Sequence, residues 1–209
     1  RVVSIDARQP EVSNWSEIIA EKEQVLEGVQ IANGKLVCSY LKDVASEINI
    51  HDSEGKFIRS IEFPTKGNAS FSGDREDKIA FYSFTSFTYP TTIFKYDMVS
   101  GAAEVFKEPA IDFDAEKYEV KQVFYPSKDG TQVPMFIVNK KGLELNGNNP
   151  CLLYGYGGFN ISITPSFSAD RLVFLENGGM YAQANMRGGG EYGEHDEYGK
   201  SGKCGEKES

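Results

Sequence analysis

The pattern of hydrophobic and polar positions changes once along the chain, near residue 110. Before that point it consists of short alternating runs, which predict β-strands with one buried and one exposed face. Two of these runs, residues 34–40 and 77–83, align with each other. Three aspartates, Asp6, Asp52 and Asp97, each end such a run and begin a turn, at spacings of 46 and 45 residues.

This repeat predicts the blades of a β-propeller. A period near 45 residues with four short strands per unit is typical of a blade, and a β-sandwich with similar strand spacing is the alternative. Residues 1–110 hold about two blades, whereas roughly three or more repeats are needed for stability. We therefore expect a piece of a longer chain. The start at Arg1, with no initiator methionine, agrees with an internal beginning, in which case the lack of a secretory signal gives no information on location.

Residues 111–194 predict a different architecture. Two alternating runs, 121–125 and 133–138, flank Asp129 and Gly130, a pair of residues typical of a tight hairpin turn. The short apolar run at residues 151–154 predicts a buried strand.

A helix and a further strand follow that run. Thr164 and Pro165 are typical of a helix start, and the glycines in residues 177–179 are typical of its end. Residues 180–186 predict the next strand. The helix has apolar residues on one face, at Ala169, Leu172, Val173 and Leu175. Strand, helix and strand in this order form a βαβ unit, so we expect an α/β region with a parallel sheet.

Composition narrows the classes of partner. The net charge of −9 disfavours a nucleic-acid partner, which would require a basic surface. No window approaches about 18 consecutive apolar residues, so neither a membrane span nor a membrane partner is predicted.

The three cysteines, Cys38, Cys151 and Cys204, are widely spaced and odd in number. They form no CxxC pair and no cluster with histidine, so we expect no disulfide framework, no metal site and no cofactor. Cys38 and Cys151 lie in apolar runs and are predicted to be core thiols. Free thiols favour a reducing compartment, and we expect the cytoplasm, with the periplasm as the alternative.

The strongest candidate for chemistry is the glycine-rich turn at residues 153–160. Glycines let the backbone approach a ligand, and Tyr156 places a hydroxyl among them. A hydrogen-bond donor at the end of a buried strand can stabilise negative charge on a reacting oxygen. The alternative is a packing turn with a buried tyrosine.

Other motifs in the sequence lack the neighbouring residues that their function would require. Residues 188–193 fit GxGxxG, but no apolar helix follows, so a dinucleotide site is not supported. Glu194 stands where a phosphate-binding loop ending at residues 199–201 requires glycine. The chain has no GxSxG segment, and neither His51, expected at a surface or edge, nor His195 has a serine and an aspartate placed for a catalytic triad.

Three segments, residues 123–131, 154–165 and 184–194, resemble the prolyl oligopeptidase (prolyl endopeptidase) family of serine peptidases. The matches are long and nearly unbroken, and the resemblance covers residues 1 to about 194. It implies a mixed fold in which the C-terminal blades of a β-propeller precede the first part of an α/β-hydrolase domain. The implied boundaries are 1–110 for the partial propeller, 111–194 for the hydrolase part and 195–209 for a divergent, disordered tail.

The resemblance also implies an activity and two site residues. The family cleaves short peptides after proline, so short proline-containing peptides are the expected partners. Tyr156 would supply the side-chain donor of the oxyanion hole, and Phe159 would line the pocket for the proline ring, with a core aromatic as the alternative for Phe159. Arg187 and the glycines after it would shape a neighbouring loop.

The catalytic serine, aspartate and histidine of the family lie beyond this chain, which we expect to be inactive alone. The sequence leaves the family pattern after Glu194, with Asp196 and Glu197 where a tryptophan and a histidine are usual. Two alternatives stay open at this point. One is a non-catalytic, propeller-type module that binds peptides, and the other is a gene fragment without a function of its own.

Overall fold

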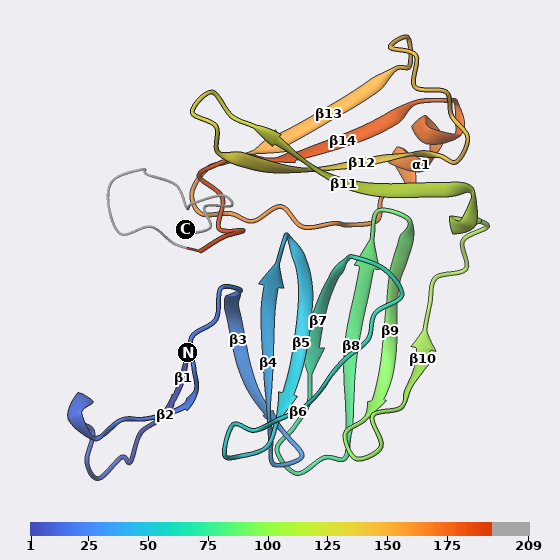
Figure 1. The fold of residues 1–209 in the computed structure, drawn as a ribbon. Helices are drawn as coiled ribbons and strands as arrows, with labels where there is room; N and C mark the ends of the chain where they lie inside the picture. Colours follow the sequence, from blue (N-terminus) through green and yellow to red (C-terminus); the bar gives the residue numbers. More distant parts are fainter. Residues whose placement is uncertain (194–209) are drawn as a thin grey trace.

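The computed structural model describes residues 1–193 and arranges their strands in three four-stranded sheets and one two-stranded sheet (Figure 1). The two-stranded sheet pairs β1 (Val2–Ser4) with β2 (Ser16–Ile19), on either side of a short 3-10 helix, η1 (Val12–Asn14). A second 3-10 helix, η2 (Ala115–Lys117), precedes the last sheet.

Two of the four-stranded sheets are antiparallel, with strands adjacent in chain order. The first sheet consists of β3 (Val25–Ala32), β4 (Lys35–Lys42), β5 (Ala45–His51) and β6 (Phe57–Ser60). The second consists of β7 (Asn68–Ser72), β8 (Ile79–Ser86), β9 (Tyr89–Asp97) and β10 (Ala103–Lys107). The aligned runs 34–40 and 77–83 fall on β4 and β8, the second strand of each sheet, so the repeat predicted from the sequence is confirmed.

The repeated aspartates perform the same task in both sheets. Asp52, directly after β5, accepts the N–H groups of Glu54 and Lys56 at 3.0 and 2.9 Å. Asp97, at the end of β9, accepts the N–H groups of two residues of the following turn at 2.7 and 2.8 Å. Gly55 and Gly101 then adopt positive φ angles of 87° and 84°, which glycine takes without strain. The third strand of each sheet therefore ends in the same aspartate–glycine turn.

The two sheets bury their faces against each other. Ile48 and Ile50 on β5 meet an aromatic cluster on the second sheet. Within that cluster the Tyr82 and Phe94 rings stack with centroids 4.8 Å apart, and Phe84 is fully buried. Mutual burial of neighbouring sheets is the packing expected of adjacent propeller blades.

The last sheet has the order β11-β12-β14-β13. Its strands are β11 (Tyr118–Pro126), β12 (Gln132–Lys140), β13 (Cys151–Tyr156) and β14 (Met180–Asn185). The hairpin between β11 and β12 turns through Asp129 and Gly130 as predicted, and Gly130 has a φ of 89°. β13 and β14 pair in parallel and are connected through α1 (Ala169–Glu176), so the expected βαβ unit is confirmed.

The helix begins later than predicted. Ser168 is its N-cap, since its side chain accepts the N–H of Arg171. Thr164 and Pro165 lie in the extended stretch before it, where Pro165 is buried. The predicted start was wrong because the chain must first cross from β13 back to the far end of the sheet.

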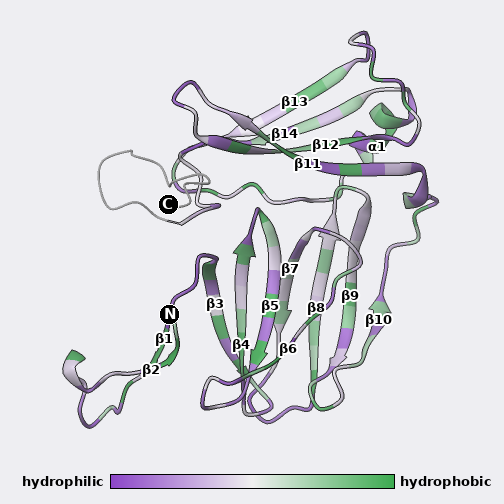
Figure 2. Ribbon diagram, viewed as in Figure 1, coloured by the Kyte–Doolittle hydropathy of each residue, from purple (hydrophilic) through white to green (hydrophobic). Residues whose placement is uncertain are grey.

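The prediction that residues 151–154 form a buried strand was also wrong. β13 is the edge strand of its sheet among the described residues, and its Leu152 and Leu153 side chains are 51% and 64% exposed. Figure 2 shows hydrophobic residues along this outer strand. Cys151 is exposed with them, whereas Cys38 is a buried core thiol as expected.

The last sheet rests on the ends of the two blades, as Figure 1 shows. Val44, at the tip of the β4–β5 hairpin, and Phe87, at the tip of the β8–β9 hairpin, are both fully buried. They pack in one core with Phe136 and Tyr181 of the last sheet, and the Phe87 and Phe136 ring centroids lie 5.3 Å apart. The equivalent hairpin of each blade thus contributes one apolar side chain to the core of the last sheet.

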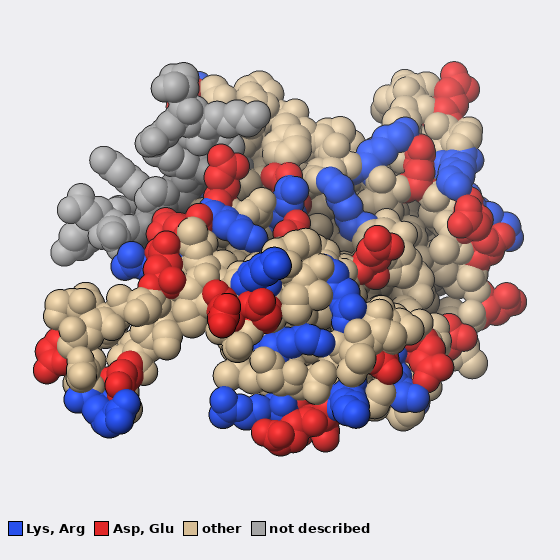
Figure 3. All heavy atoms as spheres, turned by 60° about the horizontal axis from the view of Figure 1, so that its bottom comes forward, with Lys and Arg blue, Asp and Glu red and all other residues tan. Residues whose placement is uncertain are grey.

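Charged residues are dispersed over the opposite ends of the blades. On the face that Figure 3 brings forward, Lys and Arg side chains lie among Asp and Glu side chains. The negative net charge is therefore not gathered in one patch on this face.

Candidate functional site

Tyr156 is the last residue of β13 and pairs with Asn185, the last residue of β14. Its side chain is half-buried and lies beside Gly158, because a Cβ built on Gly158 would be 3.4 Å from the Tyr156 hydroxyl oxygen. The sheet therefore fixes the Tyr156 backbone, and the glycine leaves room for the phenol ring.

The glycines of this turn pack against those of residues 188–190. A Cβ on Gly157 would lie 2.4 Å from the Arg187 carbonyl oxygen, and one on Gly188 would lie 2.1 Å from the Gly157 carbonyl oxygen. Gly190 faces Asn160 in the same way, with 2.8 Å from its Cβ position to the Asn160 carbonyl oxygen. The glycines of the GxGxxG pattern thus allow close backbone contact between two loops.

Phe159 projects from the top of the turn. Both Phe159 and Asn160 have positive φ angles, 53° and 56°, and for phenylalanine this backbone conformation costs about 1–3 kcal/mol. The Asn160 N–H donates to the Gly188 carbonyl oxygen at 3.0 Å. The Phe159 side chain is 92% exposed, so the alternative of a core aromatic is excluded for the described chain. Strained residues of this kind cluster at functional sites.

Beneath the turn lies a buried polar cluster formed by Gln183, Asn185 and Glu191. Each is at most 4% exposed. The Glu191 carboxylate accepts the N–H of Ile163 at 3.0 Å and the side-chain amide of Asn185 at 2.9 Å. The Ile163 carbonyl oxygen accepts the side-chain amides of Asn185 and Gln183 at 2.7 and 3.1 Å. Sequence reasoning missed this cluster, because nothing in the local pattern indicates that these polar residues are buried.

Arg187 connects the second glycine loop to the β11–β12 hairpin. Its guanidinium pairs with the Asp129 carboxylate and donates to the Ser127 hydroxyl at 3.3 Å. The hydrogen bond from Arg187 lowers the pKa of Asp129 below its ordinary value. The three segments that carried the family resemblance therefore meet at one corner of the sheet.

Other candidate groups lie away from this corner. His51 was expected at a surface or edge but is 3% exposed, with Nδ1 3.0 Å from the Gly55 carbonyl oxygen. No group of three or more His, Cys, Asp or Glu residues within 1–193 is placed to hold a metal ion. In the same range no helix is long and apolar enough to cross a membrane. His195, Cys204 and the tail 195–209 lie outside the described residues.

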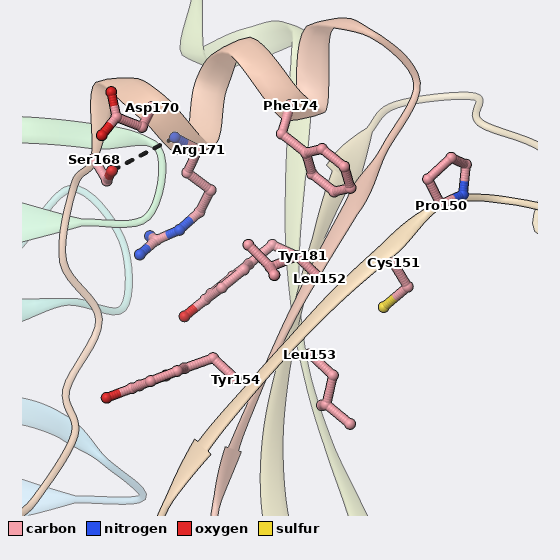
Figure 4. A pocket seen from close by; sticks show the side chains of 10 residues that line it. All are labelled: Pro150, Cys151, Leu152, Leu153, Tyr154, Ser168, Asp170, Arg171, Phe174 and Tyr181. Carbon is pink, nitrogen blue, oxygen red and sulfur yellow. Dashed lines mark hydrogen bonds between the residues drawn. The ribbon is translucent and has the colours of Figure 1, made fainter.

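A hollow of about 740 Å³ lies between β13 and α1 (Figure 4). Its walls include Leu152, Tyr154, Phe174 and Tyr181, and the Arg171 guanidinium lies 4.0 Å from the Tyr181 ring centroid. Neither Tyr156 nor Phe159 lines it. This hollow is consequently a separate feature on the helix-covered face of the sheet.

Comparison with known proteins gives a consistent picture. The family described as "Prolyl oligopeptidase, N-terminal beta-propeller domain" matches residues 1–109. The chain is 45% identical over 194 residues to the prolyl endopeptidase of Elizabethkingia meningoseptica and 41% identical over 206 residues to that of Dictyostelium discoideum. Each alignment covers 92% of this chain but only 27% of the relative.

Solved structures extend the likeness. A structure from a study of two prolyl endopeptidases and the role of inter-domain dynamics in their catalysis and specificity matches with a TM-score of 0.89 and 44% identity, over 92% of this chain and 29% of that one. Prolyl oligopeptidase B from Galerina marginata, bound to a 25mer macrocyclization substrate, matches with a TM-score of 0.84 and 32% identity, over 91% of this chain and 27% of that one.

Proposed function

Because the chain belongs to the prolyl oligopeptidase family, we propose that it is part of a serine endopeptidase that hydrolyses short peptides after proline. The observation that carries the proposal is the turn after β13. It holds the Tyr156 hydroxyl at a strand end and presents Phe159 almost fully exposed three residues later. A hydroxyl donor and an exposed aromatic ring on one turn suit a carbonyl oxygen and an adjacent proline ring.

We further propose that residues 111–194 are the first part of an α/β-hydrolase domain. The βαβ unit of β13, α1 and β14 supports this assignment. So does the edge position of β13, whose apolar side chains are exposed although parallel strands are normally covered on both sides. An uncovered, apolar parallel edge suits the addition of further strands from the longer protein.

In the proposed reaction a serine hydroxyl outside this chain attacks the carbonyl carbon of the proline residue, whose bond to the nitrogen of the next residue is the one that breaks. The serine proton passes to a histidine base, and the carbonyl oxygen becomes negatively charged as the tetrahedral intermediate forms. Tyr156 donates a hydrogen bond to that oxygen, and Phe159 packs against the proline ring. Removing one such donor lowers kcat by about 10²–10³-fold. The 209-residue chain alone supplies no nucleophile and is expected to show no turnover.

The test is a chimera that places residues 1–193 into the aligned segment of the Elizabethkingia meningoseptica enzyme. We expect it to release a chromophore from a peptide that ends in proline, and Tyr156→Phe to lower kcat by about 100-fold or more. Tyr154→Phe, two residues earlier on the same strand, is the matched control and should stay within about threefold. Equal effects of the two substitutions would contradict the proposed role of Tyr156.

Phe159→Ala in the same chimera tests the proline pocket. Since Phe159 contacts substrate in both the ground state and the transition state, KM should rise while kcat changes little. A binding module predicts a different result, in which the 209-residue chain alone binds proline peptides and both Tyr156→Phe and Phe159→Ala leave that binding unchanged. Turnover by the purified 209-residue chain would overturn the assignment of the nucleophile to another part of the protein.

A further inference from the structure

Three buried polar side chains converge on the backbone of one residue, Ile163. Glu191 accepts its N–H, and Asn185 and Gln183 donate to its carbonyl oxygen. These side chains are 20 to 28 residues away from Ile163 in sequence. The main-chain hydrogen bonds of this turn include those from the Asn160 N–H to the Gly188 carbonyl oxygen and from the Ile161 N–H to the Gly158 carbonyl oxygen, so Ile163 differs in being held by side chains.

The burial of the Glu191 carboxylate needs a physical explanation. Transferring a charge from water into a protein interior is unfavourable unless hydrogen bonds compensate, and an apolar residue fills a core at lower free-energy cost. Glu191 is compensated at one oxygen by Ile163 and Asn185. Its other oxygen occupies the side-chain space of Gly189, where a Cβ would lie 2.0 Å away. The glycine at 189 is therefore matched to the carboxylate at 191.

The turn that carries Tyr156 and Phe159 is pinned to β14 at both ends. Its first end is held because Tyr156 pairs with Asn185 in the sheet. Its second end is held because the Asn185 side chain and Glu191 bind Ile163. Between these anchors Phe159 is 92% exposed at a positive φ, so its own side-chain packing does not fix its direction.

We infer that Glu191 is a positioning residue for the turn that carries Tyr156 and Phe159. It acts through Ile163 to set the orientation of Phe159, and this role rests on the function proposed above. One carboxylate oxygen of Glu191 accepts hydrogen bonds from both the Ile163 N–H and the Asn185 side-chain amide, and the role requires this oxygen to lie within reach of both donors. Glutamine preserves that acceptor oxygen. Aspartate, one methylene shorter, keeps the charge but cannot reach both donors from the same backbone position.

Amide hydrogen exchange of the 209-residue chain tests the anchor directly. In Glu191→Ala and Glu191→Asp, amides of residues 157–163 should lose at least tenfold in protection, while those of β4 and β8 in the blades keep theirs. Glu191→Gln should resemble the parent chain, and so should Glu176→Ala, a matched control at an exposed glutamate on α1. If Glu191→Ala fails to fold, Glu191→Asp decides. Unchanged protection of residues 157–163 in Glu191→Asp overturns the inference.

Kinetics of the chimera test the consequence for Phe159. Glu191→Asp should lower kcat/KM by about 10–100-fold, since a displacement of about 1 Å has effects of this size, and Glu191→Gln should stay within about threefold. In the Phe159→Ala background the fall in kcat/KM caused by Glu191→Asp should disappear, because the positioned ring is gone. A role in general stability would instead add the two effects, and that result overturns the inference.

The two tests separate this inference from the proposed function. A parent chimera that folds but does not cleave proline peptides contradicts the proposed function, and the exchange experiment still decides whether Glu191 anchors the turn. A parent chimera that cleaves, combined with unaltered exchange in Glu191→Asp, contradicts the positioning role alone.

Discussion

Two apolar regions of the last sheet meet opposite environments. On one side, Phe87 and Val44 from the blade hairpins are fully buried against β12 and β14. On the other, Leu153 of β13 is 64% exposed. Both regions present large apolar side chains, so the difference arises from what the described chain places beside them. The contact with the two blades is buried within residues 1–193, whereas the β13 edge is uncovered among the same residues.

The substitution with the largest expected effect on stability is Phe87→Ala, at the buried junction. Removing a fully buried phenylalanine leaves a cavity between the blade tip and the last sheet, and we expect the free energy of unfolding to fall by about 3–5 kcal/mol. Urea unfolding followed by circular dichroism measures the change. Phe106→Ala on β10, where the side chain is 61% exposed, is the control and should change the value by less than about 1 kcal/mol. Similar losses for both variants would mean that the junction is not closed in solution.

Alkaline pH probes a second closed region, the core between the two blades, in which Tyr82 is buried. Burial raises the pKa of Tyr82 to about 12, from an ordinary value of 10.0. Between these values the unfolded chain releases the Tyr82 proton and the folded chain keeps it. The contribution of Tyr82 is therefore complete below pH 10 and is lost as pH rises through 12, at up to about 1.4 kcal/mol per pH unit.

Tyr82→Phe removes this titration. The variant should lose less stability than the parent chain between pH 10 and pH 12. Below pH 11 the absorbance of ionised tyrosine in the folded state should be the same in the two proteins, since Tyr82 is still protonated there and does not contribute to it. Identical pH dependence of the two proteins in urea unfolding would show that Tyr82 is accessible to hydroxide in the folded chain.

The smallest effect on the free energy of unfolding is expected at the exposed β13 edge. Leu153→Lys places a charge on the exposed β13 edge and should change the free energy of unfolding by less than about 0.5 kcal/mol. It should also reduce self-association, measured by sedimentation velocity, because charged residues block pairing between edge strands. A loss above about 2 kcal/mol would indicate instead that this edge is covered in solution.

The elements whose signals are local could be predicted from the sequence. The blade repeat, the Asp129–Gly130 hairpin and the βαβ order depend on alternation and turn residues within one stretch of chain, and they were correct. The exposure of Leu152 and Leu153 was missed because it depends on the neighbours of β13 in the sheet. The helix start was missed because the chain stays extended from Pro165, which is buried, to the N-cap Ser168.

The residues of the candidate site could likewise be predicted only where their signal is local. Tyr156 and Phe159 lie in a glycine-rich segment that is visible in the sequence, and their roles stay proposals that the chimera tests. Glu191 was not singled out, because its significance comes from Ile163 and Asn185, which the fold brings to it. In the sequence Glu191 stands directly after three glycines, within both the GxGxxG pattern and the segment 184–194 that carries the family resemblance, and neither pattern indicates what its carboxylate binds.

The burial of Val44 and Phe87 in the last sheet has a consequence for recombination between relatives. A crossover near residue 110 follows the sequence boundary, yet it would combine blade tips from one parent with Phe136 and Tyr181 from another. Differences in side-chain volume would then meet inside a single core. Exchanges that keep residues 44 to 181 from one parent avoid this mismatch. The segment that should be exchanged as one piece is therefore longer than the segment that the sequence pattern suggests.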